Sequence, residues 1–333
     1  MDSSTLNSLL HEYEQKRIKA HISLDERKKE LFLKYPDLAD IENEINLISI
    51  KKINLILSSN STEFNNINSK IDDLKKQKNQ LLKKYNIKPD FFKPLYECNI
   101  CEDTGYIKKN NKSVMCSCLK QKLFDLQYNK CNIGNLACEN FSTFSLDYYS
   151  DEVNAEKYGI LISPRENIKR IKDLSINFIN NFDNPQQKNL LFTGETGLGK
   201  TFLCNCIADE LLHKGKTVLY QTAPVMIDSI INYRFSKTPA SNNIIDHILN
   251  VDLLIIDDLG TETLNTMKLT ELFTIINSRI LNQNNKITKT IISTNLSLQD
   301  LFSVYNERIG SRFIGHYDIF KFVGDDIRFK KKL

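Results

Sequence analysis

The sequence predicts an α/β fold: a parallel five-stranded sheet between helices, preceded by a helical, coiled-coil-like arm and a small cysteine-rich segment. Three observations support it. Beyond about residue 141, short apolar runs alternate with helical stretches, which is typical of a parallel sheet covered on both faces. Residues 1 to about 88 contain no Gly and place apolar residues at helical spacing. Between these parts, the composition changes to Pro, Gly, aromatic residues and Cys.

Composition and charge exclude several classes of protein. Of the 333 residues, 41% are hydrophobic and 26% charged, as in an ordinary soluble protein. The formal net charge of +4 is too small to indicate a nucleic-acid partner by itself, although a local basic patch can exist within a balanced total. No stretch approaches 18 apolar residues, and the first 25 residues mix charged with apolar side chains. We therefore expect no membrane span and no secretory signal, and a cytoplasmic protein.

The first 90 residues are expected to form the helical arm. Apolar residues recur at helical spacing in two series, Ile41, Ile45 and Ile48, and then Phe64, Ile67, Ile71, Leu74 and Leu81. Pro36 and the polar run 58–61 interrupt the pattern, so two or three helices are predicted. Such stripes are typical of a bundle or antiparallel coiled coil packed on itself, and equally of an arm that grips a partner.

Five apolar runs are expected as the strands of the sheet. They cover residues 190–193, 218–222, 253–257, 290–294 and 319–323. With the helical stretches between them, they place the α/β domain at residues 140–333.

The strongest motif follows the first of these runs and fits G-x-x-x-x-G-K-[ST]. It consists of Gly194, Glu195, Thr196, Gly197, Leu198, Gly199, Lys200 and Thr201. Glycines let backbone N–H groups curl around phosphate oxygens, and the helix that follows adds positive potential at its N-terminus. Lys200 is expected to reach the β- and γ-phosphates, and the Thr201 hydroxyl to bind Mg²⁺. The motif predicts a P-loop that binds a nucleoside triphosphate.

Two further strands end in polar side chains that fit the same chemistry. Asp257 and Asp258 end the third run, where Asp257 is expected to bind Mg²⁺ and Asp258 to polarise the attacking water. Asn295 follows the fourth run and is expected to orient the water or to sense the γ-phosphate. Glu262 is a nearby acid that we do not expect to be the base.

Three arginines in the last part of the chain are candidates for phosphate contacts. Arg308 and Arg312 lie four residues apart, on one face of a predicted helical turn, and Arg328 follows the last strand. Surface ion pairing is the common role of such residues. The alternative is an arginine finger that neutralises γ-phosphate charge, often from a neighbouring subunit.

These motifs together resemble one known family. The segments 194–201, 253–262, 293–295 and 307–312 are similar to those of the bacterial replicative helicase loaders of the DnaC/DnaI type, which belong to the initiator clade of AAA+ ATPases. The resemblance covers roughly residues 95–333. It implies an AAA+ ATPase domain at 140–333 and a helicase-interaction role for the arm at 1–90.

The resemblance also implies activity, partners and residue roles. Such loaders bind the hexameric, DnaB-type replicative helicase through the N-terminal part, bind single-stranded DNA through the ATPase domain, and self-associate. It implies ATP and Mg²⁺ as cofactors, with hydrolysis weak and stimulated by DNA or assembly. Arg308 resembles the arginine finger that acts in trans, Arg312 its neighbour at the nucleotide, and Arg328 the second sensor. Most such ATPases carry Glu where Asp258 stands.

Four cysteines predict a structural zinc site within residues 91–135, a knuckle and linker. The ligands are expected to be Cys98, Cys101, Cys116 and Cys118, two close pairs separated by 14 residues. A redox role for the first pair is disfavoured, because no thioredoxin-like context surrounds it and the second pair would have no use. Cys131 or Cys138 remains an alternative to one ligand of the second pair.

Two other functions remain open beside the loader. A transposition helper of the IstB type shares the same ATPase core, and a non-hydrolysing adaptor would use ATP only to order an assembly. DNA contact is a weak expectation from the sequence, because the polar stretch with Tyr233, Arg234 and Lys237 is at least as typical of a solvated loop.

Overall fold

The computed structural model describes residues 3–58, 61–109, 111–127, 138–236, 242–263, 265–282 and 286–329. Within these residues, no helix combines the length and the apolarity needed to cross a membrane. The chain divides into two compact units, Asp2–Val114 and Met115–Leu333.

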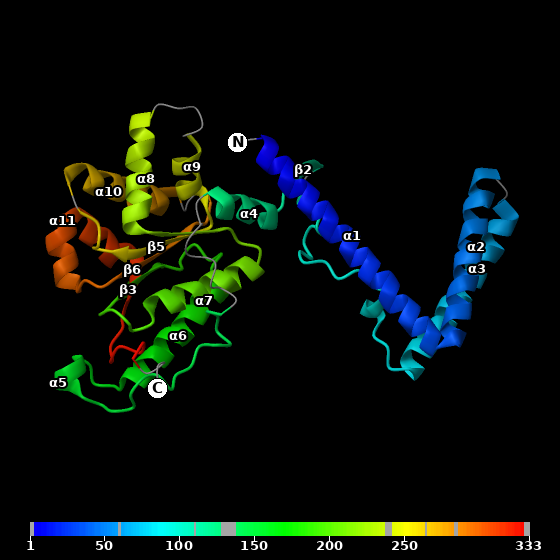
Figure 1. Cartoon of the computed structure of the whole chain (residues 1–333), viewed down its shortest axis with the longest axis horizontal. Coiled ribbons are helices and arrows are strands. Elements are labelled where there is room, and N and C mark those ends of the chain that lie inside the picture. The colour runs from blue at the N-terminus through cyan, green and yellow to red at the C-terminus, as the bar shows by residue number, and fades with distance from the viewer. Residues whose placement is uncertain are drawn as a thin grey trace. The chain divides into compact units, whose positions relative to one another are not determined.

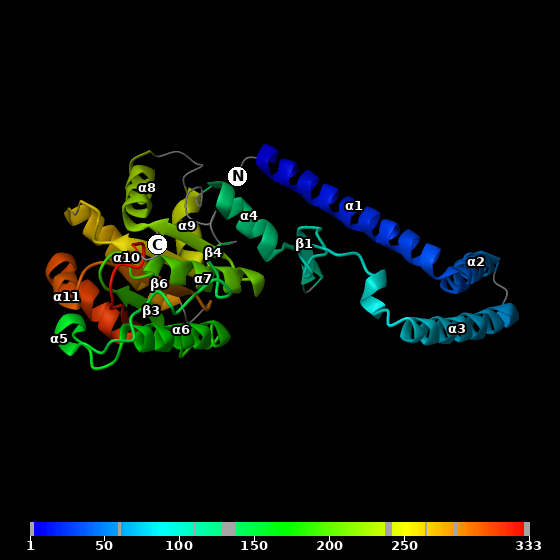
Figure 2. The same ribbon diagram turned by 60° about the horizontal axis from the view of Figure 1, so that its bottom comes forward.

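The first unit is built on three helices, coloured blue to cyan in Figures 1 and 2. They are α1 (Ser3–Lys34), α2 (Pro36–Ser58) and α3 (Ser61–Lys84). The break before Pro36 lies where the sequence predicts it. Helices α2 and α3 lie side by side, and the two predicted apolar series meet in a small core of Ile48, Ile71 and Leu74. This part of the arm therefore packs on itself.

Helix α1 has a partner that periodicity did not indicate. The chain returns through the short 3₁₀ helix η1 (Pro89–Phe92) and runs back along α1. The rings of Phe32 and Phe92 lie 6.4 Å apart, and further along the helix Lys16 forms an ion pair with Glu97. The segment from η1 to Glu97 therefore contacts one side of α1. This segment has no repeating apolar pattern, so periodicity could not indicate the contact.

The second unit contains the predicted sheet, and its five strands are all parallel in the order β4-β5-β6-β3-β7. The strands are β3 (Asn189–Thr193), β4 (Val218–Thr222), β5 (Leu253–Leu259), β6 (Lys289–Thr294) and β7 (Tyr317–Lys321). The prediction for the last strand was shifted: β7 begins at Tyr317 because this residue pairs with Asn189 at the start of β3. Phe322 and Val323 are buried beyond its end.

Helices cover both faces of the sheet, as predicted (Figures 1 and 2). They are α6 (Pro164–Asn180), α7 (Lys200–His213), α8 (Ala223–Ser236), α9 (Asn242–Asn250), α10 (Thr266–Asn282) and α11 (Leu298–His316), and the short helix α5 (Ala155–Tyr158) precedes α6. Alternate strand residues enter two separate cores: Leu190 and Phe192 pack with α6 and α7, whereas Leu191 packs with α8 to α11. Burial on both faces explains why the strands read as unbroken apolar runs.

One edge of the sheet is protected by a side chain from the cysteine-rich segment. This segment forms the hairpin β1 (Tyr106–Lys109) and β2 (Lys112–Met115), followed by helix α4 (Ser117–Gln127). Gln121 in α4 accepts a hydrogen bond from Val218 N at 2.7 Å and donates one to Val218 O at 2.9 Å. The amide thus satisfies backbone groups of the edge strand β4, where an open edge would invite pairing with another chain.

Candidate functional site

The phosphate loop lies between β3 and α7, at the carboxyl end of the sheet, where ligands bind in open parallel sheets. Its glycines adopt positive φ, with 141° at Gly194, 75° at Gly197 and 88° at Gly199. A Cβ at Gly194 would overlap the carbonyl oxygen of Phe322, and one at Gly199 would overlap the Tyr149 hydroxyl. Gly194 and Gly199 are therefore required for two reasons. Their positive φ angles are unfavourable for other residues, and neighbouring atoms leave no space for a Cβ.

Lys200 is the buried cation of the site. Its Nζ donates to Gly194 O at 2.6 Å, to Glu195 O at 2.7 Å and to Asn295 Oδ1 at 2.8 Å. Burial lowers the pKa of Lys200, whereas the nearby carboxylates Asp257 and Asp258 raise it. The three contacts place Asn295, at the end of β6, beside the phosphate loop, as the sequence predicts.

Asp257 and Thr201, the residues expected to bind Mg²⁺, lie within hydrogen-bond distance of each other. The Thr201 hydroxyl donates to Asp257 Oδ2 at 2.9 Å, and the Tyr220 hydroxyl donates to the same oxygen at 2.6 Å. A carboxylate and a hydroxyl at the mouth of a phosphate loop are the oxygen ligands that suit Mg²⁺. The residues present therefore fit the ion, and Asp257 and Thr201 would hold it. Burial raises the pKa of Tyr220, so this hydroxyl remains a donor.

Asp258 occupies a β-bulge in β5. Its φ is 54°, and the register between β5 and β6 shifts between Ile256 and Leu259. The bulge interrupts the regular alternation of side chains at this acid, and bulges are common near functional sites. Burial, and then the charge of Asp257, raises the pKa of Asp258, while Lys200 opposes the shift. A carboxylate with a raised pKa suits a general base.

Arg328 lies beside the phosphate loop, in a segment that follows β7. Ile327 N donates to Gly197 O at 2.9 Å, and the Asp326 carboxylate lies where a Cβ of Gly197 would be. Arg328 Nε donates to both oxygens of Asp326, at 2.9 and 3.1 Å, and this bond lowers the pKa of Asp326. The sequence singled out the arginine but missed the acid that holds it two residues earlier.

Arg308 and Arg312 lie on a different surface. Together with Phe273, Glu307 and Ser311 they line a pocket of about 500 Å³. Arg312 Nε donates to Asn277 Oδ1 in α10 at 2.9 Å, whereas Arg308 is exposed. None of the contacts described for these two arginines involves the phosphate loop.

Helix α11 is kinked directly before Arg308. Asn306 has φ 64° and ψ 166°, and its Oδ1 accepts from Arg308 N at 3.1 Å and Ile309 N at 3.3 Å. The kink separates two helical segments, and Asn306 is the N-cap of the second. Arg308 thus stands in the first turn of a helix, whose N–H groups at Arg308 and Ile309 are capped by Asn306. The helical spacing indicated one face of a turn but not this new helix start.

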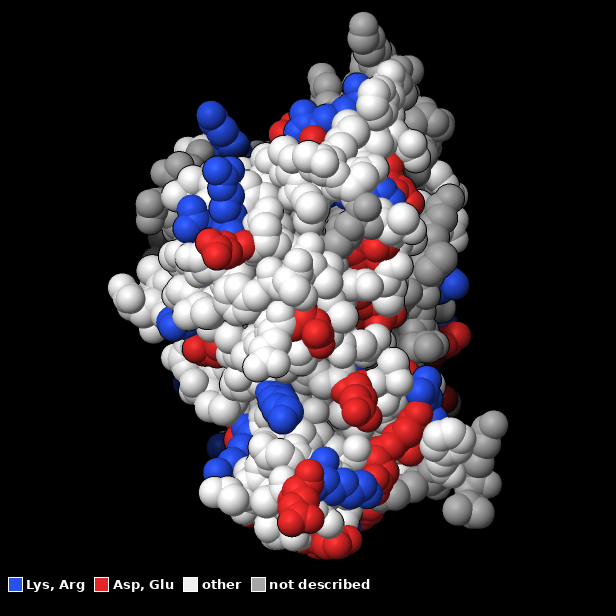
Figure 3. Space-filling view, turned by 90° about the vertical axis from the view of Figure 1, so that its left-hand side faces the viewer, with Lys and Arg blue, Asp and Glu red and all other residues white. Residues whose placement is uncertain are grey.

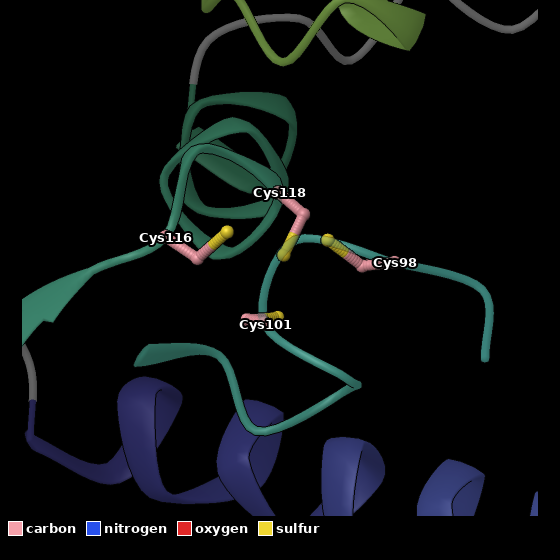
Figure 4. Close-up of side chains that lie close together, drawn as sticks. All are labelled: Cys98, Cys101, Cys116 and Cys118. Atoms are coloured by element: carbon pink, nitrogen blue, oxygen red, sulfur yellow. The ribbon is translucent and has the colours of Figure 1, made fainter. Parts of the chain in front are cut away.

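The four predicted cysteines lie together (Figure 4). The Sγ atoms of Cys98, Cys101, Cys116 and Cys118 all lie within 4.8 Å of one another. In a tetrahedral Zn–S₄ site with bonds of about 2.3 Å, the sulfurs would be about 3.8 Å apart. The cluster can therefore hold a metal ion. Cys138 does not belong to it, and Cys131 lies outside the described residues.

Asp103 shapes the first cysteine turn. Its two oxygens accept from Cys98 N at 2.8 Å and Glu97 N at 2.9 Å, and Gly105 has φ 73°. The acid is buried, with its side chain turned to the backbone, so it orders the chain around the cysteines.

The stretch suggested for DNA contact gives no clear interface. Arg234 forms an ion pair and a second hydrogen bond with Glu271, which fixes α8 on α10. Lys237 and the side chain of Tyr233 lie outside the described residues. On the face of the second unit that carries α8, α10 and α11, Figure 3 shows basic and acidic side chains interspersed on a mostly uncharged surface. No broad basic surface is visible among the described residues of this face.

Comparison with known proteins decides the family. A model of the family described as IstB-like ATP binding protein matches residues 152–333, more than half of the chain. The chain belongs to the IstB-like ATP-binding family. ATP binding follows from this family and agrees with the geometry of the phosphate loop.

Individual relatives of this IstB-like protein include helicase loaders and an insertion-sequence protein. The replicative helicase loader DnaC of Escherichia coli (strain K12) is 31% identical over 123 residues, which cover 37% of this chain and 48% of that protein. The ATP-binding protein of insertion sequence IS1162 from Pseudomonas fluorescens is 27% identical over 110 residues, which cover 33% and 46%. This chain thus spans about half the length of these relatives.

Solved structures are similar as well. The crystal structure of the DnaC helicase loader is 24% identical to this chain and aligns with a TM-score of 0.44, covering 57% of this chain and 99% of that one. The resemblance to the DnaC type, indicated by the motifs, is confirmed by the curated relatives, and the predicted five-stranded parallel sheet is confirmed by the strand pairing.

Proposed function

We propose that this IstB-like protein is an ATP-dependent loader that binds the replicative helicase hexamer and helps to place it on single-stranded DNA. One observation carries the proposal: the chain that forms this phosphate site is similar over 123 residues to a replicative helicase loader. We infer that the arm, residues 1–90, contacts the helicase, since such a helical extension precedes the ATPase domain. The cysteine cluster is proposed to hold zinc, which stabilises the knuckle that follows the arm.

The proposed activity is weak ATP hydrolysis, stimulated by DNA or assembly. Lys200 and the loop amides would hold the β- and γ-phosphates, and Asp258 would accept the proton of the attacking water, which Asn295 orients. Mg²⁺ at Asp257 and Thr201 would neutralise charge on the phosphates.

The arginines would act from two subunits. Arg328 lies beside the loop of its own chain and would contact the γ-phosphate there. Arg308 and Arg312 line a separate, exposed pocket, so they would reach the nucleotide of a neighbouring copy of the chain. Self-association through the ATPase domain is thus part of the proposal.

Helicase binding by the full chain tests the proposal. The chain, the host's replicative helicase and a fluorescent single strand are mixed with ATP, and helicase retained on the strand is measured after gel filtration. We expect the wild type to increase retention, and Lys200→Ala to abolish the increase because phosphate is no longer held. An undetectable complex with the helicase would contradict the loader.

The transposition helper is the second candidate, because the family and the IS1162 relative favour it. A helper would act on double-stranded target DNA with a transposase and would leave helicase retention unchanged. The adaptor differs from both in its chemistry: normal ATP binding without turnover on single-stranded DNA would support it and exclude the ATPase.

A further inference from the structure

A buried acid–tyrosine pair joins the turn after β5 to helix α11. Glu262 is 7% exposed and Tyr305 is 0% exposed. The Tyr305 hydroxyl donates a short hydrogen bond to Glu262 Oε1, and Gly260 N donates to Glu262 Oε2 at 2.9 Å. Both carboxylate oxygens are therefore engaged, one by a distant helix and one by the turn itself.

The turn held by Glu262 begins at the proposed catalytic acid. The Thr261 hydroxyl donates to Asp258 O at 2.8 Å, and the Thr294 hydroxyl donates to Leu259 O at 2.5 Å. Asp258 itself has a positive φ of 54°, which a non-glycine residue keeps only when its surroundings enforce it. The hydrogen bonds of the turn, with Glu262 at its far end, supply that enforcement.

Simple packing does not explain a carboxylate at this position. Burying a charged group is costly, and an apolar side chain of similar size would fill the space without that cost. A carboxylate offers what an apolar group lacks: two acceptors, here aimed at Gly260 N and at the hydroxyl of Tyr305. Burial and the bond to Glu262 raise the pKa of Tyr305, so its hydroxyl stays protonated and remains the donor.

We propose that Glu262 and Tyr305 are positioning residues for hydrolysis, which hold the turn 258–262 so that the Asp258 carboxylate stays directed at the phosphate site. The proposal rests on the proposed ATPase function. Neither residue is assigned a proton transfer with the reacting water, because both side chains are buried and bonded to each other and to the turn. Their effect passes through the backbone of the turn to Asp258.

Four variants of the full chain test this role, with ATP turnover and binding of a fluorescent ATP analogue measured for each. Tyr305→Phe removes only the hydroxyl. Glu262→Ala removes both acceptors, whereas Glu262→Gln keeps an acceptor for Gly260 N and offers an amide to Tyr305. Tyr317→Phe is the matched control, since it removes another buried hydroxyl, bonded to Thr290, away from the turn. Thermal unfolding is recorded for all variants.

We expect Tyr305→Phe and Glu262→Ala to lower kcat about tenfold or more, with unchanged affinity for the ATP analogue, because a displaced catalytic group costs rate and not binding. Glu262→Gln should retain most of the turnover, and Tyr317→Phe should lose only thermal stability. If Tyr305→Phe does not fold, the comparison of kcat between Glu262→Gln and Glu262→Ala tests the positioning role instead.

Three results would overturn the proposal. An inactive Glu262→Gln beside an active Tyr305→Phe would make Glu262 the base. Unchanged kcat in both Tyr305→Phe and Glu262→Ala would leave the pair a structural contact. A wild type that binds ATP without turnover would remove the ATPase function itself, and with it the role of the pair.

Discussion

At the scale of single residues, the candidate site contains two adjacent carboxylates with different partners. Asp257 accepts two hydroxyl hydrogen bonds, while Asp258 lies in the bulge with a raised pKa. These two adjacent aspartates therefore have different surroundings: Asp257 is held by hydroxyl hydrogen bonds, and Asp258 lies in the bulge. The pair Asp-Asp in the sequence suggested two different roles, and their different surroundings in the structure are compatible with that proposal.

The raised pKa of Asp258 predicts an acid limit to turnover. A carboxyl with a raised pKa remains protonated to higher pH, so the basic form is lost as pH falls through a value above the ordinary 3.9 or so of an aspartate. We expect kcat at saturating ATP to decline at mildly acidic pH, and Asp258→Asn to abolish turnover while ATP still binds. A flat profile down to pH 4 or so, with the fold intact by circular dichroism, would assign the base elsewhere.

Asp326 predicts a measurable effect on ATP affinity. Its carboxylate lies against Gly197 and holds Arg328, so it places negative charge where phosphates are to bind. Asp326→Ala should release Arg328 and tighten ATP binding a few-fold, measured by titration of a fluorescent analogue. Asp325→Ala is the control, because Asp325 pairs with Lys157 instead. Weaker binding in Asp326→Ala would instead show that the acid orients Arg328 for the nucleotide.

At the scale of elements, periodicity predicted the regular parts well and their ends less well. The strand β4 has the predicted bounds, and α2 and α3 bury the predicted stripe. The break in α11 at Asn306 was not predicted, because an Asn within a helical pattern looks the same whether it continues a helix or caps a new one. The predicted bounds of the last strand were shifted from those of β7. The pairing of β7 with β3 sets these bounds, and β3 is distant in the sequence.

The cysteine knuckle predicts a metal-dependent element. We expect about one zinc per chain by elemental analysis, and loss of that zinc in Cys98→Ser and Cys116→Ser, because a closed four-sulfur site fails without one ligand. Cys138→Ser is the matched control and should keep its zinc. ATP binding should survive metal removal by a chelator, since the phosphate loop does not use these residues. Full zinc content in Cys116→Ser would mean that another residue supplies the ligand.

At the scale of the whole molecule, the candidate arginines lie on separate surfaces. Arg328 is fixed beside the phosphate loop, whereas Arg308 and Arg312 line a separate pocket. One chain therefore presents a phosphate site and an arginine surface that do not serve each other directly. This division is what an assembly of identical subunits requires, where each site is completed by the next copy.

Mixing two inactive variants tests that division. Lys200→Ala should lose ATP binding, while Arg308→Ala should bind ATP and lose turnover. An equimolar mixture should recover part of the turnover, because a Lys200→Ala subunit can still offer Arg308 to the intact site of its neighbour. Turnover is measured against protein concentration, with each variant alone as control. A mixture that stays inactive, or an Arg308→Ala chain that still hydrolyses ATP, would contradict action in trans.

The sequence by itself determined the fold class, the phosphate loop, the acids at the strand ends and the cysteine ligand set. These features are local: a strand, a loop and a helix in succession, or two short cysteine pairs, require particular residues at fixed spacing. Only the tertiary structure decided which distant side chains complete them. Tyr220 on Asp257, Gln121 on the edge of β4 and Tyr305 on Glu262 all join residues from different elements. Such contacts leave no periodic trace in a single sequence, because they arise when packing brings separate segments within hydrogen-bond distance.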